Sequence, residues 1–218
     1  LQSVIEANGR LLRDRLLAVG RGDRLDGPPQ LRPRLGLGSS RRPAGAPPLD
    51  RLALGVADLP GGGIVRSSGW ITTPGIQGFD RSLRVNVRPV GGSYLTDLEV
   101  VLLQHDDLPG AKSSYTSMVD AAFFSALIER TARLASTRAL KLRGPDRTPV
   151  AIGDEASILE WQLETPIGPG RVVTVITRVG TRVEALVATG SGAMLHPEDV
   201  AALLKGVAGR LGTSAPAR

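Results

Sequence analysis

The two histidines of the sequence are its strongest candidates for metal or acid–base chemistry, because each stands beside carboxylates. His105 is followed directly by Asp106 and Asp107, and His196 begins the sequence His-Pro-Glu-Asp. Imidazole and carboxylate groups are ordinary ligands of divalent metals, so a metal-assisted active site would form if the two loops met at one end of a sheet. The spacing does not require this, and His196 also suits a structural position before a helix. We therefore expect no metal site.

Motifs for the other common reaction types are missing from the sequence or have a simpler explanation. Without Cys the chain has no thiolate nucleophile, no Cys-ligated metal and no disulfide. The Gly-x-Ser-x-Gly pattern of hydrolases and the Gly-rich phosphate-binding patterns do not occur. Glu160 and Glu164 alternate with Trp161 and Leu163, which is typical of the solvated face of a strand rather than of a catalytic pair. We expect no catalytic residue and no cofactor.

Two tryptophans are the best candidates for contact with a ligand. Aromatic residues make up only 3% of the chain, so Trp70 and Trp161 are rare bulky side chains. Each is expected to fill the core, and the floor of a ligand pocket is the alternative for both. Together with His105 and His196, they make up the predicted ligand-binding residues.

Positive charge is concentrated near the N-terminus. The net charge is +6, and residues 1–51 contain ten Arg against five acidic residues, which accounts for +5. Nucleic-acid binding through this Arg-rich arm is therefore one hypothesis. A GC-rich genome also encodes much Arg, Ala, Gly and Pro, and few aromatic side chains are present to stack on bases. We expect the partner to be something other than nucleic acid.

The last sixty residues predict an antiparallel meander closed by a helix. Apolar and polar residues alternate in three runs, 158–164, 171–179 and 182–188. After a Gly-rich break, Pro, Glu and Asp begin an apolar-striped helix over 197–211. The valine-rich run 172–179 would favour pairing at a sheet edge if it were exposed, which keeps an assembly role open.

Shorter patterns predict the other elements of the folded part. Five strands are expected, over 64–71, 79–87, 94–103, 139–142 and 149–152. The strands over 79–87 and 94–103 are expected to pair as a hairpin. The strands over 139–142 and 149–152 surround a turn at Gly144-Pro-Asp, and a helix is expected from an N-cap at Ser117 to about residue 135. The fold class is therefore α+β, a mainly antiparallel sheet with helices packed on one face.

Composition divides the chain into four parts. We expect an amphipathic helix over 1–19, a Pro/Gly/Arg-rich linker over 20–50, a single α+β domain over 51–212 and a frayed tail over 213–218. The N-terminal helix either packs on its own domain or makes peripheral contact with a membrane. Because the chain begins with Leu rather than Met, we expect the natural start, with a signal peptide or anchor, to lie upstream.

The order of these elements resembles that of a known group of proteins. Asp-Leu-Pro-Gly occurs at 58–61 and again at 107–110, and Gly-Asp-Glu, the meander and a helix beginning Pro-Glu-Asp follow. Over 56–110 and 150–211 this resembles secreted domains and lipoproteins of actinobacteria, which include extracytoplasmic sensor domains of kinases and relatives of the PsbP/Mog1-type α+β fold. The kinase sensor domains usually carry disulfides, whereas this chain has no Cys. The resemblance implies an extracytoplasmic, non-enzymatic domain with a cleft for an unknown ligand.

The sequence thus predicts a non-enzymatic extracytoplasmic domain, sensor-like or lipoprotein-like, that binds a small ligand or a cell-envelope protein. The linker supports this, because such segments commonly tether a folded domain to an anchor. Two alternatives stay open. One is an enzyme with a metal-assisted site built from the two histidines and their Asp neighbours, and the other is a nucleic-acid binder acting through the Arg-rich arm.

Overall fold

The computed structural model describes residues 48–59, 61–73, 75–85, 95–120, 141–165, 168–191 and 195–213. Along them lie the elements α2 (Leu49–Leu52), the 3-10 helix η1 (Val56–Asp58), β1 (Gly63–Thr73), β2 (Ile76–Val85), β3 (Leu95–His105), α3 (Leu108–Met118), β4 (Lys141–Pro149), β5 (Glu155–Thr165), β6 (Gly168–Val179), β7 (Arg182–Ser191) and α5 (Pro197–Thr213). The predicted helix over 1–19 and most of the predicted linker lie outside the described residues. Within the described part of the chain, no helix has the length and hydropathy to cross a bilayer.

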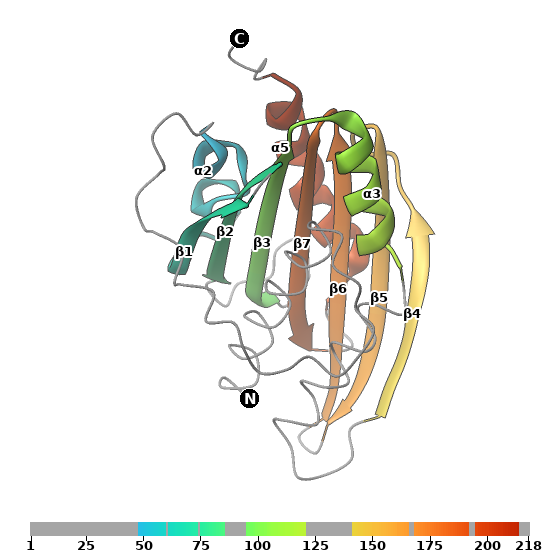
Figure 1. The fold of residues 1–218 in the computed structure, drawn as a ribbon. Helices are drawn as coiled ribbons and strands as arrows, with labels where there is room; N and C mark the ends of the chain where they lie inside the picture. The colour runs from blue at the N-terminus through green and yellow to red at the C-terminus, as the bar shows by residue number, and fades with distance from the viewer. Residues whose placement is uncertain are drawn as a thin grey trace.

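The seven strands form one antiparallel sheet in the order β1-β2-β3-β7-β6-β5-β4 (Figure 1). Strands β1 to β3 pair in sequence order, and so do β4 to β7. The two groups join where β7 pairs with β3, so the last strand of the chain lies at the centre of the sheet. The predicted α+β class, the hairpin of β2 and β3 and the C-terminal meander are confirmed.

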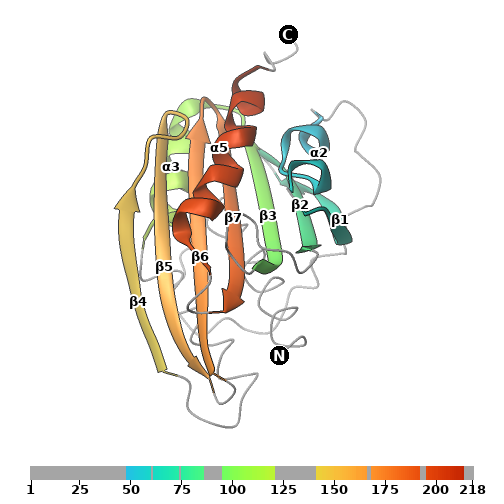
Figure 2. The same ribbon diagram turned by 180° about the vertical axis from the view of Figure 1, so that it is seen from behind.

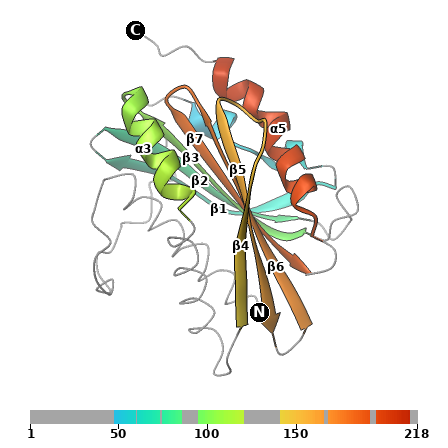
Figure 3. The same ribbon diagram turned by 90° about the vertical axis from the view of Figure 1, so that its right-hand side faces the viewer.

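Helices cover both faces of the sheet, which corrects the prediction that they pack on one face. α5 and α2 lie over one face and α3 lies over the other (Figures 2 and 3). Each face has its own core. Leu204 of α5 packs in one cluster with Val175, whereas Tyr115 of α3 packs in the other with Trp161 and Ile176.

The central strands explain this arrangement, because they are apolar on both faces. In β6 every residue from Val172 to Ile176 is buried. A strand with water on one face would alternate buried and exposed residues, so β6 must be covered on both sides. β6 is also an interior strand, so the edge pairing suggested by its valine content is not open to it.

α5 follows its predicted pattern. It begins at Pro197, with Glu198 and Asp199 in the first turn and Arg210 in the last, where their charges suit the helix dipole. The predicted buried stripe is confirmed at all five positions, Val200, Leu203, Leu204, Val207 and Leu211.

β4 is one strand where the sequence predicted two short strands and a turn. Its pairing with β5 continues past Gly144 and Pro145, with a register shift between Arg143 and Asp146. These residues form a bulge rather than a turn, and an edge strand tolerates the missing N–H of a proline. The strand predicted over 149–152 is also wrong, because residues 150–152 lie outside any strand.

α3 begins before the predicted helix. Its N-cap is Asp107, whose Oδ1 accepts a hydrogen bond from the Gly110 N–H at 2.7 Å, and Pro109 occupies the first turn. Ser117, predicted as an N-cap, is the second-last residue of α3. Residues 121–135 of the predicted helix lie outside the described part of the chain.

The turn before β5 yields a first prediction, because Gly153 has a φ of +65°. A Cβ at this position would lie 2.7 Å from the Arg178 carbonyl oxygen. Gly153→Ala is therefore expected to lower the free energy of unfolding by about 2 kcal/mol, measured by urea denaturation.

Gly206→Ala is the matched control for that change. Gly206 lies on the exposed side of α5, where an added Cβ meets no atom within 4 Å. The control is expected to raise the free energy of unfolding by about 0.5–1 kcal/mol, because Ala favours the helix. Equal stability of Gly153→Ala and the wild type would contradict the described turn.

Candidate functional site

The structure separates the two histidines that the sequence singled out. His105 ends β3 on the α3 face and is only 4% exposed, whereas His196 is exposed and precedes α5 on the other face. His105 lies at the end of the sheet where β7 begins at Arg182, and His196 at the end where β7 finishes near Gly190. Eight residues of strand correspond to roughly 26 Å. The two imidazoles therefore cannot share a metal ion.

Residues around His105 do not assemble a metal site either. Within the described ranges, no three His, Asp or Glu side chains lie close enough together to hold one ion. Burial lowers the pKa of His105, against the opposite influence of Asp107 and Asp106. Asp107 is already used, since it caps α3.

The two tryptophans occupy opposite cores. Trp70 of β1 packs on Phe79 with ring centroids 5.2 Å apart, in the core below α5. Trp161 of β5 is fully buried in the core below α3. The four residues predicted to bind a ligand, Trp70, Trp161, His105 and His196, therefore do not form one site.

The carboxylates of Glu160 and Glu164 are each paired with an Arg. Glu164 is exposed and lies 3.2 Å from Arg143. Glu160 is mostly buried and lies 3.2 Å from Arg171, so this position is less solvated than the alternation suggested.

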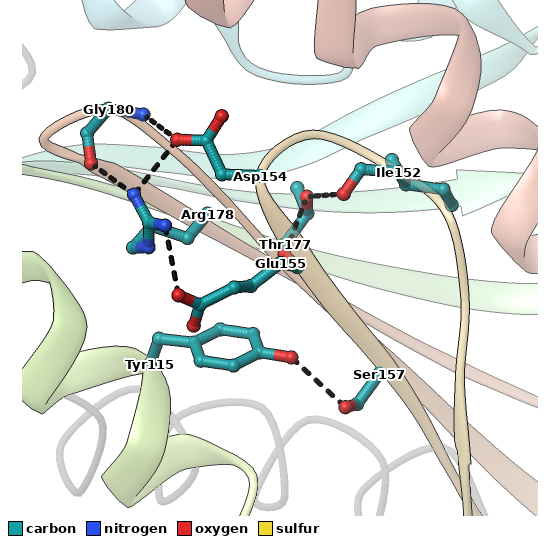
Figure 4. Close-up of polar contacts among 8 residues, drawn as sticks. All are labelled: Tyr115, Ile152, Asp154, Glu155, Ser157, Thr177, Arg178 and Gly180. Carbon is teal, nitrogen blue, oxygen red and sulfur yellow. Dashed lines mark hydrogen bonds and ion pairs between the residues drawn. The ribbon is translucent and has the colours of Figure 1, made fainter.

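A polar cluster on the α3 side fixes the turn that leads into β5 (Figure 4). The buried guanidinium of Arg178 donates to Asp154 at 2.9 Å and to Glu155 at 3.0 Å. Nearby, the hydroxyl groups of Tyr115 and Ser157 lie 3.0 Å apart and join α3 to β5. These contacts hold backbone segments together, and we assign them a structural role.

The most unusual polar group lies below the α5 face. Glu184 of β7 is 0% exposed, and its Oε1 accepts a hydrogen bond from the Leu54 N–H at 3.0 Å. Its Oε2 is buried and has no hydrogen-bond partner among the described residues. Burial raises the pKa of Glu184 to about 7, although the Leu54 hydrogen bond and the charge of Arg210 act in the opposite direction. Groups that titrate near neutral pH are common at functional sites.

Residues 48–59, which contain α2 and η1, cover Glu184 and are called the cover segment below. Asp58 forms a two-bond ion pair with Arg210, at 2.6 and 2.8 Å. Arg81 donates to the carbonyl oxygens of Leu54, at 2.8 Å, and Asp50, at 2.9 Å. The hydrogen bond from Arg210 holds the pKa of Asp58 below its usual value. The buried apolar residues of the cover segment are Leu49, Leu52, Ala53, Leu54 and Leu59.

Sequence reasoning missed this cluster. The one available signal was that Glu184 alternates with Leu186 and Ala188, so that a carboxylate lies on an apolar face of the strand. Its partner Leu54 is 130 residues away in the chain, so no local pattern could connect the two.

The two edges of the sheet differ in their protection against further strands. β4 contains Pro145, Pro149, a bulge and four charged residues, which are features that prevent strand addition. β1 has a register shift of its own between Val65 and Ser67, but it contains no Pro, and Arg66 is its one charged residue. From Ser67 to Thr73 its pairing with β2 is regular. Among the described residues, no strand pairs with the outer side of β1.

Two apolar side chains are exposed at the start of β1. Ile64 is 60% exposed and Val65 is 46% exposed. Val65 pairs with Leu83, so it lies on the α5 side beside the cover segment, and Ile64 pairs with the exposed Arg84 on the other side. The β1 edge and the cover segment together are the candidate functional site.

Neither a family model, nor a curated protein, nor a solved structure matches this chain.

Proposed function

We propose that this chain is a non-enzymatic binding domain that takes an extended segment of a partner protein as an additional strand on β1. The contrast between the two sheet edges supports this most strongly, because β4 carries two prolines and four charged residues, whereas β1 carries no proline and one charged residue. In strand addition the backbone hydrogen bonds supply affinity, and the side chains on alternate residues supply specificity.

The surroundings of β1 define the chemistry of the partner. Ile64 and Val65 offer apolar contacts on the two faces of the added strand. Arg66 and Arg84 bring positive charge, and β1 itself contains no carboxylate. We therefore expect an extended segment in which apolar residues are accompanied by Asp or Glu, because complementary charge favours encounter and register.

A second copy of this chain fits the edge less well. Pairing β1 with another β1 would set Arg66 against a strand that contains neither Asp nor Glu. Such a contact would bury apolar surface without charge complementarity, so the proposal is a partner protein rather than a homodimer.

The test uses the full 218-residue chain and a panel of short peptides. One set alternates apolar residues with Asp or Glu, and a matched set has Lys at the acidic positions. The acidic set is expected to bind, as measured by fluorescence anisotropy, and Val65→Lys is expected to weaken binding about tenfold by repelling an added strand. Thr148→Lys on exposed β4 is the matched control and is expected to leave binding unchanged.

Three outcomes would contradict the proposal. The first is equal binding of the acidic and basic peptides, and the second is loss of binding in Thr148→Lys but not in Val65→Lys. The third is a peptide-free dimer that Val65→Lys dissociates, since a second copy would then occupy the edge.

Location beyond the membrane is part of the same proposal and rests on the composition of residues 20–50, which resembles that of tethers. Protease added to intact cells of the source organism is expected to digest the native protein. Digestion only after lysis would contradict this part of the proposal.

A further inference from the structure

We propose that Glu184 and the cover segment form a pH-sensitive switch, in which ionisation of Glu184 releases residues 48–59 from the sheet and enlarges the apolar surface beside β1. The effect on binding rests on the proposed function. The release itself does not, and it can be measured without a partner.

Glu184 has no contact with water while the cover segment is in place. Its side chain is 0% exposed, and one of its two carboxyl oxygens accepts a hydrogen bond from the Leu54 N–H. Across the ladder its neighbours are Leu102 in β3 and Thr177 in β6, and neither carries a charge. The Thr177 hydroxyl donates instead to a backbone carbonyl oxygen. An ionised Glu184 would therefore be buried with one oxygen unsolvated, which is costly.

Charged side chains reach this region from four elements: Asp50 of α2, Asp58 of η1, Arg81 of β2 and Arg210 of α5. Both arginines are already engaged, Arg210 by Asp58 and Arg81 by two backbone carbonyl oxygens. The charge of Asp58 opposes ionisation of Glu184, whereas those of Arg210 and Arg81 favour it. Desolvation is the larger influence, so an ionised Glu184 gains most by reaching water.

The cover segment is the element that can give Glu184 access to water. It consists of a four-residue helix and a three-residue 3-10 helix, whereas the strands around Glu184 are held by continuous ladders. Short elements outside the hydrogen-bonded ladders of a sheet open at lower free energy than its central strands. Opening would break the hydrogen bonds of Arg81 and Leu54 and the Asp58–Arg210 ion pair, and it would expose the buried apolar residues of the cover segment, while the sheet stays intact.

Proton linkage gives the expected size of the effect. Burial raises the pKa of Glu184 from 4.5 to about 7 in the closed state, and exposure to water returns it to its usual value. Protonated Glu184 therefore favours the closed state, and rising pH favours the open one. Between about pH 5.5 and about pH 8.5 the opening constant is expected to rise about 30-fold.

Release changes the docking edge because the cover segment adjoins β1. A Cβ on Gly63 would lie 3.0 Å from Leu59 Cδ1, and Val65 lies on the same side of the sheet. Trp70 and Phe79 belong to the apolar cluster that the cover segment completes. Opening would uncover part of this cluster, so a partner strand with apolar side chains on that face would bind more tightly at higher pH.

Hydrogen exchange on the full chain tests the switch. The reporters are the amides of Leu54 and Gly55, which donate to Glu184 and Asp58, and the reference is the Leu186 amide at the centre of β7. After correction for intrinsic rates, exchange at the reporters is expected to rise about 30-fold from about pH 5.5 to about pH 8.5, with no equal rise at Leu186. Glu184→Gln removes the titrating group and is expected to abolish the rise.

Glu160→Gln is the matched control, since Glu160 lies in β5 and pairs with Arg171 away from the cover segment. It is expected to keep the wild-type pH dependence. A flat profile in the wild type, an unchanged profile in Glu184→Gln, or an equal rise at Leu186 would each overturn the switch. Anilinonaphthalene sulfonate fluorescence should rise with pH in parallel, because this dye reports exposed apolar surface.

The acidic peptide separates the two proposals. Tighter binding at higher pH that Glu184→Gln abolishes supports both. Reporter exchange that follows pH, without any peptide binding at β1, supports the switch and overturns the proposed function alone.

Discussion

Glu184→Gln is expected to make the protein more stable than the wild type at neutral and alkaline pH. The folded-state pKa of Glu184, about 7, lies above its usual value of 4.5, so the folded state binds more protons than the unfolded chain in this interval. Its contribution to stability is therefore complete below pH 4.5 and is lost as pH rises through about 7. Gln stays neutral, so the stability difference between variant and wild type should grow by about 2–3 kcal/mol from about pH 5 to about pH 8, measured by urea unfolding.

Other titrating groups do not produce this difference. Asp58 has a lowered pKa, so its contribution is lost only as pH falls through that value, below 3.8 and outside the interval. His105 has a lowered pKa and acts in the opposite direction to Glu184, but it is present in both proteins and cancels in the comparison. A stability difference between Glu184→Gln and the wild type that does not grow between about pH 5 and about pH 8 would show that burial does not raise the pKa of Glu184 in the fold.

Trp161→Ala is expected to lower the free energy of unfolding by about 3–5 kcal/mol, because Trp161 is fully buried and its removal leaves a cavity below α3. Urea or thermal unfolding measures the loss. Trp161→Phe keeps an aromatic ring in the same core and should cost clearly less. Wild-type stability of Trp161→Ala, with altered binding of a ligand, would instead favour the pocket role that the sequence left open for this residue.

Local patterns accounted for the elements whose burial alternates or repeats. The stripe of α5 from Val200 to Leu211 and the β5–β7 meander follow from periods of 3.6 and 2 residues. The two-sided burial was also present in the sequence, since Val172, Val173, Val175 and Ile176 of β6 are apolar on both faces. Considered as a single strand, that run would favour edge pairing only if it were exposed, and the neighbours of β6 were needed to place it in the interior.

Other features depend on contacts that no local pattern contains. Gly144-Pro145 has the composition of a turn, but pairing with β5 makes it a bulge within β4. Leu108-Pro-Gly110 also has the composition of a turn, but it forms the first turn of α3 because Asp107 caps the helix. The candidate site is the extreme case, because the position of β7 between β3 and β6 brings Glu184 to Leu54, which is 130 residues away in the chain.

Amide exchange of β1 with and without the acidic peptide is the decisive test of strand addition at this edge. An added strand bonds to the N–H groups on the outer side of β1, which belong to alternate residues. Peptide binding is expected to slow exchange at every second amide between Ser67 and Thr73 and to leave exchange in β4 unchanged. Binding that protects no amide of β1, or that protects β4 instead, would contradict it.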